Sequence, residues 1–352
     1  MGASPYLLPD GNVQIAFSGG RSSAMMLHHI LEANAGIPDR AALTFQNTGR
    51  EMPETLDFVT ECGNRWSAPI VWLEYAPRRS ITSKELDLVA RIFGPRYAAR
   101  LESWWVPTPS GFRIVSHNSA ARHGEPLLAL ILIRKFLPNQ AARFCTTETK
   151  VRTAKRYLLS LGWERWTNLC GMRADEPSRL NREQPKERWT ADFPLAAAGV
   201  TKRDVAAFWR AQPFDLRLPN INGNCWLGNC DGCFLKSEAN LSALARDYPN
   251  RHWWWEKCEE LIGALWPSLT PFQRLRRICV AEPDLPGKLR EAYGRPLNAS
   301  LIQMIVNNPR SASAWSKRYR RHDLRTFMER QSDAFDVNDG QLCQADGGEC
   351  FG

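Results

Sequence analysis

The start of the chain alternates short β-rich runs with amphipathic stretches, and this alternation restricts the fold more than any other feature. The β-rich runs cover residues 13–17, 42–45 and 70–75, and helical spacing marks residues 24–31 and 55–65 between them. A βαβαβ order predicts a parallel sheet with right-handed crossovers. We therefore expect an α/β fold with helices on both faces of the sheet and ligands beyond the carboxyl ends of its strands.

Later segments extend this pattern and divide the 352-residue chain. Helical patterns return at 126–136, 147–161, 238–247 and 252–265, and residues 166–170 have the pattern of a strand. The expected units are an α/β domain at 1–220 with an irregular insertion at about 80–125, a cysteine loop with helices at 221–265, a basic and mainly helical region at 266–330, and an acidic tail at 331–352.

Composition argues against a membrane protein and for reduced cysteines. No apolar run approaches the length of a bilayer span, and the first 14 residues lack the pattern of a secretory signal, so we expect no membrane partner and a cytoplasmic location. In that compartment ten cysteines favour thiols or metal ligands over disulfides. The net charge of +9 is uneven, since residues 267–330 carry 13 Lys and Arg against 5 Asp and Glu.

A glycine- and serine-rich segment follows the first expected strand and opens the first helix. Glycines let backbone N–H groups turn toward an anion, serines add donors, and a helix N-terminus adds positive potential. An ordinary Gly-Gly turn with a serine N-cap is the alternative. The candidate phosphate-binding residues are Ser18, Gly19, Gly20, Arg21, Ser22 and Ser23.

Three cysteines stand at C-x4-C-x2-C spacing in a loop rich in Gly and Asn. Cys225, Cys230 and Cys233 can converge there on one metal or cluster, which needs a fourth ligand. Cys145, at the start of a helix, is our choice. Spacing does not separate structural zinc from an iron–sulfur cluster. The remaining cysteines within helix or strand patterns are expected to be buried thiols: Cys62, Cys170, Cys258 and Cys279.

Several segments, taken in order, resemble the PP-loop ATP pyrophosphatases and, within them, the PAPS reductase-like (adenine nucleotide alpha hydrolase-like) proteins. Residues 18–23 resemble the family's SGGxxS loop, although Ser22 stands where many members have Asp. Residues 45–56 resemble its NTG-E-xx-T element. The resemblance implies a HUP-like fold that binds ATP and Mg²⁺, with Asn47, Thr48 and Glu51 near the nucleotide. Alone, this second element also suits an Asx turn with a helix cap.

Two further elements of the resemblance carry basic residues. Cys145 and Lys150 resemble the family's C-xxxx-K element, and Arg173 and Arg179 its G-x-R-xx-E-xx-R stretch. Guanidinium groups match phosphate or sulfate oxygens in two-point geometry, so Arg173 is a candidate catalytic cation and Arg179 a candidate nucleotide ligand. Lys150 is a second candidate catalytic cation. A solvated loop of mixed charge is the alternative for both arginines.

The cysteine pattern indicates which group of this family the chain resembles. Reductases with a cluster carry two adjacent cysteines before the lysine, whereas Thr146 follows Cys145 here. With a lone cysteine at this position, the chain instead resembles the sulfurtransferases that thiolate nucleic acid, including the DNA phosphorothioation sulfotransferase-like proteins. This resemblance implies a [4Fe-4S] cluster.

The C-terminal region offers a nucleic-acid contact and a tail thiol. Residues 310–325 interleave six basic residues with Trp315 and Tyr319, which suits phosphates and bases, although a solvated helix face is an equal alternative. Core packing is the favoured role of the three tryptophans at 253–255. Cys350 loosely resembles the nucleophile of sulfonucleotide reductases, with Cys343 as a resolving partner.

We therefore expect an ATP-dependent, adenylating sulfurtransferase that acts in nucleic-acid or nucleotide thiolation and draws on a sulfur-donor protein. One alternative is a phosphoadenylyl-sulfate or adenylyl-sulfate reductase that uses Cys350. Another is a non-catalytic nucleic-acid-binding protein with structural zinc.

Overall fold

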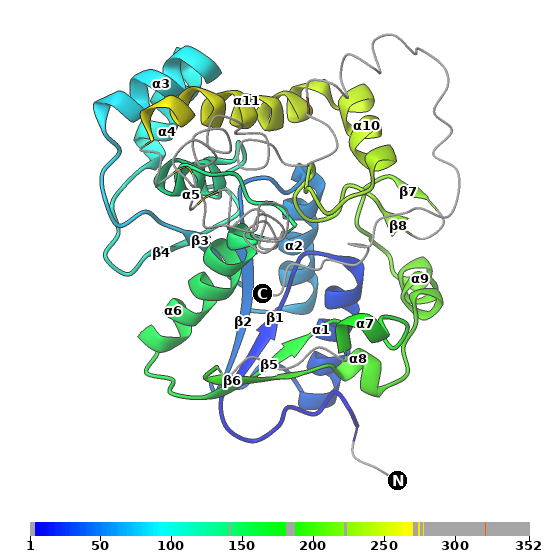
Figure 1. Ribbon diagram of the computed structural model, residues 1–352. Helices are drawn as coiled ribbons and strands as arrows, with labels where there is room; N and C mark the ends of the chain where they lie inside the picture. Colours follow the sequence, from blue (N-terminus) through cyan, green and yellow to red (C-terminus); the bar gives the residue numbers. More distant parts are fainter. Residues whose placement is uncertain are drawn as a thin grey trace, which may run out of the picture.

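A six-stranded, mostly parallel sheet forms the centre of the protein (Figure 1). The computed structural model describes residues 4–140, 142–180, 187–221, 224–269, 274, 277 and 321. The strands lie in the order β4-β3-β2-β1-β5-β6, and only β4 runs antiparallel to its neighbour among these six. Their bounds are β1 Val13–Ala16, β2 Ala41–Asn47, β3 Val71–Tyr75, β4 Phe112–Val115, β5 Trp166–Cys170 and β6 Trp189–Asp192.

Helices cover both faces of this sheet, as the sequence predicts. The chain passes from β1 to β3 through α1 (Arg21–Asn34) and α2 (Pro53–Trp66), then returns past β1 to β5 through α5 (Glu125–Arg134), η1 (Thr146–Val151) and α6 (Arg152–Ser160). Right-handed crossovers in opposite directions place α1 and α2 on one face and α6 on the other, where it packs on β2, β3 and β4. The strand order therefore reverses between β1 and β5, which defines a switch point for ligands.

The segment at 80–125 is more regular than the sequence analysis indicated. It contains α3 (Ser83–Phe93), α4 (Pro95–Trp104) and the edge strand β4. A capping box starts α3, because the Thr82 hydroxyl accepts from the Glu85 N–H at 3.3 Å while the Glu85 carboxylate accepts from the Thr82 N–H at 3.0 Å.

The last described helices pack on this insertion. In Figure 1, α10 (Glu238–Asp247) and α11 (Pro249–Leu265) lie with α3 beyond the carboxyl ends of β1 and β2. Trp254 and Trp255 are buried, as expected of core residues, while Trp253 is 37% exposed. The remaining described elements are α7 Pro177–Leu180, α8 Pro194–Ala197, α9 Lys202–Ala211, the hairpin β7 Asn220–Ile221 with β8 Asn224–Cys225, and η2 Trp266–Ser268.

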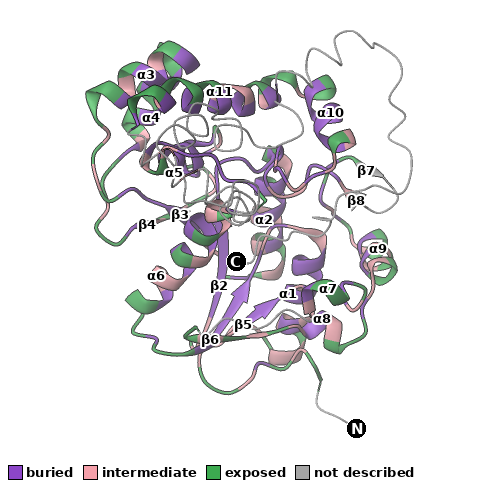
Figure 2. Cartoon of the chain, viewed as in Figure 1, coloured by how far each residue is buried: buried purple, intermediate pink, exposed green. Residues whose placement is uncertain are grey.

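The core lies between the sheet and its helices (Figure 2). Every residue of β1 is buried, and so are the thiols of Cys62, Cys170 and Cys258, which confirms the expectation for these three cysteines. Cys279 lies outside the described residues. No helix in the described part of the chain is both long and apolar enough to cross a bilayer.

Candidate functional site

The loop after β1 is a tight turn shaped by its glycines and serines. Gly19 has a φ of +76°, and a Cβ there would lie 2.9 Å from Thr55 Cγ2, so the turn requires glycine at this position. Gly20 has a φ of −100° and precedes α1 as its N-cap. The Ser18 and Ser23 hydroxyls are 2.9 Å apart, and Ser23 Oγ donates to the Gly20 carbonyl at 2.9 Å. The loop therefore presents the N-terminus of α1 at the carboxyl edge of the sheet.

Residues after β5 close on this loop at the switch point. A Cβ on Gly171 would lie 2.8 Å from Ser23 Cα, so only glycine allows this approach of the two backbones. Arg173 Nη1 donates to Ser22 Oγ at 3.3 Å, which places one predicted catalytic cation beside the loop. Arg179 Nη1 donates instead to Glu176 Oε1 at 2.7 Å. Arg173 thus contacts the loop through Ser22, and it also forms an ion pair with Asp175 at 2.9 Å.

Arg21 points toward the segment that precedes the cysteine loop. Its Nε donates to Asp215 Oδ1 at 2.7 Å, and the two side chains form an ion pair. Burial lowers the pKa of Arg21, but the hydrogen bond to Asp215 and the charges of Cys225 and Asp215 outweigh burial and leave the pKa above its ordinary value. Arg21 therefore connects the loop after β1 to the segment that leads into the cysteine loop.

The segment after β2 forms the Asx turn that was one of its two interpretations. The Gly49 N–H donates to Asn47 Oδ1 at 3.1 Å, and Asn47 Nδ2 donates to Glu74 Oε1 at 2.6 Å. The Thr48 N–H and hydroxyl both bind the Glu51 carboxylate, at 3.0 and 2.8 Å. Asn47, Thr48 and Glu51 are buried, and the Thr48 hydroxyl also lies 3.2 Å from Cys230 Sγ. This segment thus contacts the cysteine loop directly.

A pocket gathers three of the four predicted metal ligands with the predicted catalytic lysine. Its enclosed space is small, with a cavity volume of about 20 Å³. Cys145 and Lys150 enter it from the start and end of η1, a π-helix of the kind that often marks functional sites. Cys230 and Cys233 enter from the cysteine loop, whereas Cys225 lies in β8 and is not part of the pocket wall. The other lining residues are Thr48, Leu127, Pro138, Thr146, Thr149, Phe234, Leu235 and Trp255.

A buried ion-pair cluster holds the cysteine loop against the segment after β2. Asp231 is fully buried, binds Arg50 at 2.8 Å and forms a second ion pair with Arg251. Trp255 Nε1 also donates to this carboxylate at 2.8 Å. Burial raises the pKa of Asp231, but the two guanidinium groups outweigh burial and hold the pKa below its ordinary value. Sequence reasoning missed this cluster because no spacing relates residues so far apart in the chain.

A buried lysine fixes the same loop from within. Lys236 Nζ donates to the carbonyls of Trp226 and Gly228, the latter at 2.9 Å. The position of Lys236 just after Cys233 is the one signal that could have suggested it.

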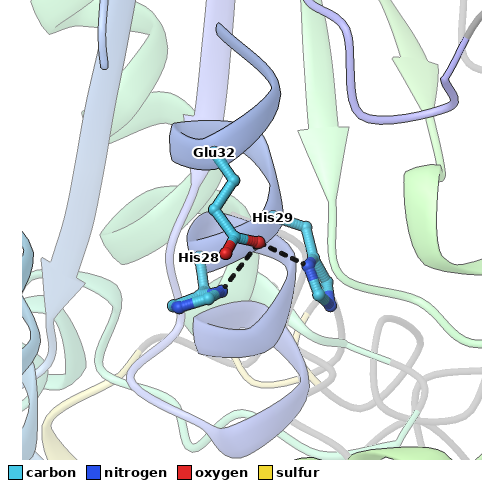
Figure 3. A group of neighbouring side chains, drawn as sticks. All are labelled: His28, His29 and Glu32. Carbon is cyan, nitrogen blue, oxygen red and sulfur yellow. Dashed lines mark hydrogen bonds and ion pairs between the residues drawn. The ribbon is translucent and has the colours of Figure 1, made fainter. Parts of the chain in front are cut away.

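A second group of metal-ligand type lies on α1. Figure 3 shows His28 and His29 directed at the Glu32 carboxylate, with Nδ1···Oε2 distances of 3.3 and 3.1 Å. All three ligand atoms lie within 4.8 Å of one another, and no three of the thiols in the described part of the chain meet that limit.

The C-terminal predictions fall almost entirely outside the described residues. Cys343, Cys350 and residues 310–320 and 322–325 belong to that part of the chain. Arg321 is described and is only 1% exposed, with Nη2 donating to the Gly232 carbonyl at 2.7 Å. The expectation that Arg321 contacts nucleic-acid phosphates is therefore wrong, because its side chain is buried against the cysteine loop.

The fold and this site define an α/β protein with a mostly parallel sheet and a thiol-lined pocket at the carboxyl edge of its strands. The chain matches no family model. It is similar to a phage protein, the uncharacterized nin region protein ORF290 of Escherichia phage lambda, with 27% identity over 236 residues. The similar region covers 66% of this chain and 69% of the phage protein. That name describes no activity.

Proposed function

We propose that the protein is an ATP-dependent, adenylating sulfurtransferase with a HUP-like, PP-loop fold. The observation that carries this proposal is the 3.2 Å contact between the Thr48 hydroxyl and Cys230 Sγ. It joins the segment proposed to lie near the nucleotide to the proposed metal site, although the two residues are 182 positions apart. An enzyme that activates its acceptor with ATP and then transfers sulfur requires these two sites to be adjacent.

The loop after β1 would hold the phosphates of ATP. Ser18 and Ser23 supply hydroxyl groups, and the N-terminus of α1 supplies N–H donors and positive potential. Phosphoryl chemistry is mainly positioning and charge neutralisation, so Mg²⁺ and a cation beside the loop would share that work. Arg173 suits this role because it contacts Ser22 and remains next to the switch point.

The thiols of the pocket would hold an iron–sulfur cluster, the metal centre that the resemblance in the sequence implies. Cys145, Cys230 and Cys233 surround unfilled space, and the walls are mainly apolar, with Lys150 among them. The Thr48 hydroxyl lies near Cys230 Sγ, where a hydrogen bond would tune a cluster. Cys225, in β8 of the same loop, would be the fourth ligand. When bound, a [4Fe-4S] cluster would supply a site for sulfide.

Atoms and electrons balance in the proposed reaction when the donor supplies sulfur at the oxidation level of sulfide. An acceptor oxygen attacks the α-phosphorus of ATP and pyrophosphate leaves, which forms an adenylated acceptor. A sulfur nucleophile from the donor then attacks the acceptor atom that carries this oxygen, and AMP leaves with the oxygen. Lys150, buried in the pocket, would hold negative charge that develops during this second step.

Metal analysis and pyrophosphate release together test this proposal. We expect the full chain, purified anaerobically, to contain iron, to absorb broadly in the visible range, and to release pyrophosphate from ATP when nucleic acid is present. Zinc without iron and without pyrophosphate release would favour the binding-module alternative. Release of sulfite from a sulfonucleotide with a thiol reductant would favour the reductase alternative and overturn this proposal.

A further inference from the structure

The segment that leads into and out of the thiol-lined pocket is strongly basic. Residues 134–156 contain seven Lys and Arg and one acidic residue. Lys150 is buried in the pocket, whereas the other six are exposed or half-buried. We call these six the η1 basic surface: Arg134, Lys135, Arg143, Arg152, Lys155 and Arg156. Figure 2 shows the exposed and intermediate positions of α6 on the side of the helix away from the sheet.

A single carboxylate forms ion pairs with three of these cations. Glu148 is buried and binds Arg152 at 2.7 Å and Arg156 at 3.3 Å, and it also forms an ion pair with Arg134. One negative charge cannot balance three guanidinium groups. The side chains of Arg134 and Arg152 remain 46% and 53% exposed, so they can bind an anion while Glu148 keeps them in place.

The C-terminal region adds a further cation at the same place. Arg277 donates from Nε to the Lys135 carbonyl and from Nη2 to the Arg134 carbonyl, both at 3.0 Å. The Phe144 ring lies 5.8 Å from the Arg134 guanidinium. Guanidinium groups beside an aromatic ring suit the phosphates and bases of a nucleic acid.

We propose that the η1 basic surface binds the phosphates of a nucleic-acid strand and presents one nucleotide to the thiol-lined pocket. This inference rests on the proposed function, because it names nucleic acid as the acceptor class. Arg143 and Arg152 flank the pocket residues Cys145 and Lys150 along the chain, so a strand bound to these arginines would run along the segment that carries both pocket residues. The surface replaces Arg321, which is buried, as the expected point of contact.

The test compares two triple variants of equal charge change in the full chain. Lys135→Gln, Arg143→Gln and Arg152→Gln together remove three cations from the η1 basic surface while Arg134 and Arg156 still neutralise Glu148. The control, Lys202→Gln, Arg203→Gln and Arg210→Gln, changes α9, which packs on α1 on the opposite face of the sheet. Melting temperatures confirm that both variants fold.

Binding is measured without ATP, by fluorescence anisotropy of labelled single-stranded DNA, duplex DNA and RNA of one sequence. We expect the η1 variant to bind at least about tenfold more weakly and to lower the slope of log K against log salt by about 2, since each lost phosphate contact removes about 0.7–0.9. The control should change affinity less than about twofold. The nucleic acid with the largest loss identifies the acceptor.

Equal losses in the two variants, or no loss in either, would overturn the proposal. A second result would also overturn it: labelled poly-glutamate binds the wild type as tightly as nucleic acid does, and its affinity falls by the same factor in the η1 variant. The surface would then bind anions in general. The outcome is separable from the proposed function. Nucleic-acid binding without pyrophosphate release would support the binding surface and contradict the proposed enzymatic function. Pyrophosphate release without an effect of the η1 variant on binding would contradict the binding surface alone.

Discussion

Two adjacent glycines in the loop after β1 have different structural requirements. Gly19 needs its positive φ and has no room for a Cβ, whereas a Cβ on Gly20 would meet only Ser18 Oγ, at an ordinary 3.5 Å. We predict that Gly20→Val keeps the fold but weakens ATP binding at least about tenfold, because the new side chain occupies the phosphate approach. Titration calorimetry with Mg²⁺ and ATP measures this effect.

Gly19→Ala is the matched comparison. A positive φ costs a residue with a side chain about 1–2 kcal/mol, and the contact with Thr55 adds to that cost, so this variant should lower the free energy of unfolding. Unchanged ATP affinity in a folded Gly20→Val protein would remove the phosphate assignment of the loop.

Thiol reactivity separates the buried cysteines from those of the pocket. Burial raises the pKa of Cys170 to about 12 and also raises those of Cys62 and Cys258. Because the thiolate is the nucleophile, these three residues should resist alkylation at pH 8 in the folded protein. Cys145 and Cys233 are half-buried and should react after reduction and metal removal. Peptide mass spectrometry after a short iodoacetamide pulse reports both sets, and Cys170 labelled as fast as Cys233 would contradict the prediction.

Secondary-structure elements could be predicted where local pattern and tertiary role agree. The strand at 166–170 and the helix at 238–247 match β5 and α10, because their patterns are regular and bounded by turn residues. The helices at 80–125 were missed even though Thr82 and Glu85 form a readable capping box. The expected helix at 147–161 begins within the π-helix η1, which contains Lys150 and follows directly after Cys145.

The attachment of the cysteine loop depends on its buried ion pairs. We predict that Asp231→Asn lowers the free energy of unfolding by about 3–5 kcal/mol, because Arg50 and Arg251 lose a fully buried partner. Urea unfolding measures the change. Glu187→Gln is the control, since it removes only a surface ion pair with Lys155 and should cost about 0–1 kcal/mol. A loss as small as that of the control would mean that the cluster does not hold the loop.

The same variant should show a pH signature. The folded pKa of Asp231 lies below its ordinary value, so its contribution is present above about pH 4 and is lost as the pH falls through the folded pKa. The stability difference between the wild type and Asp231→Asn should therefore be constant near neutrality and shrink in acid. A difference that grows in acid would contradict the assigned direction.

At the scale of the whole molecule, the sequence located the parts of the candidate site but not what joins them. The loop at 18–23 and the cysteines follow from local spacing, and their meeting at one edge of the sheet follows from the βαβ order. Contacts such as Thr48 with Cys230 and Arg50 with Asp231 link distant segments, and a single sequence contains no signal for such pairs. Arg321 shows the same limit. The composition of residues 310–325 indicated an exposed segment, whereas packing buries the Arg321 side chain.

A bound metal should connect parts of the chain that are far apart in sequence. Cys145 belongs to the crossover that covers the sheet, while Cys230 and Cys233 belong to the loop beneath α11. We predict that Cys145→Ser and Cys230→Ser each lose the metal and lower the melting temperature of the anaerobic protein, because the energy of binding to the folded site is lost. Cys62→Ser, a change in the core under α2, should keep the full metal content.

Metal stoichiometry is the deciding measurement, because Cys62→Ser can also lower the melting temperature by placing a hydroxyl in an apolar core. Chelation of the wild type should reproduce the melting temperature of Cys145→Ser and should change that of Cys145→Ser itself very little. Full metal content in Cys145→Ser would remove this residue from the site and leave the cysteine loop alone to hold the metal. Metal that persists in both variants but disappears from His28→Ala would place it instead on α1, where His28, His29 and Glu32 converge.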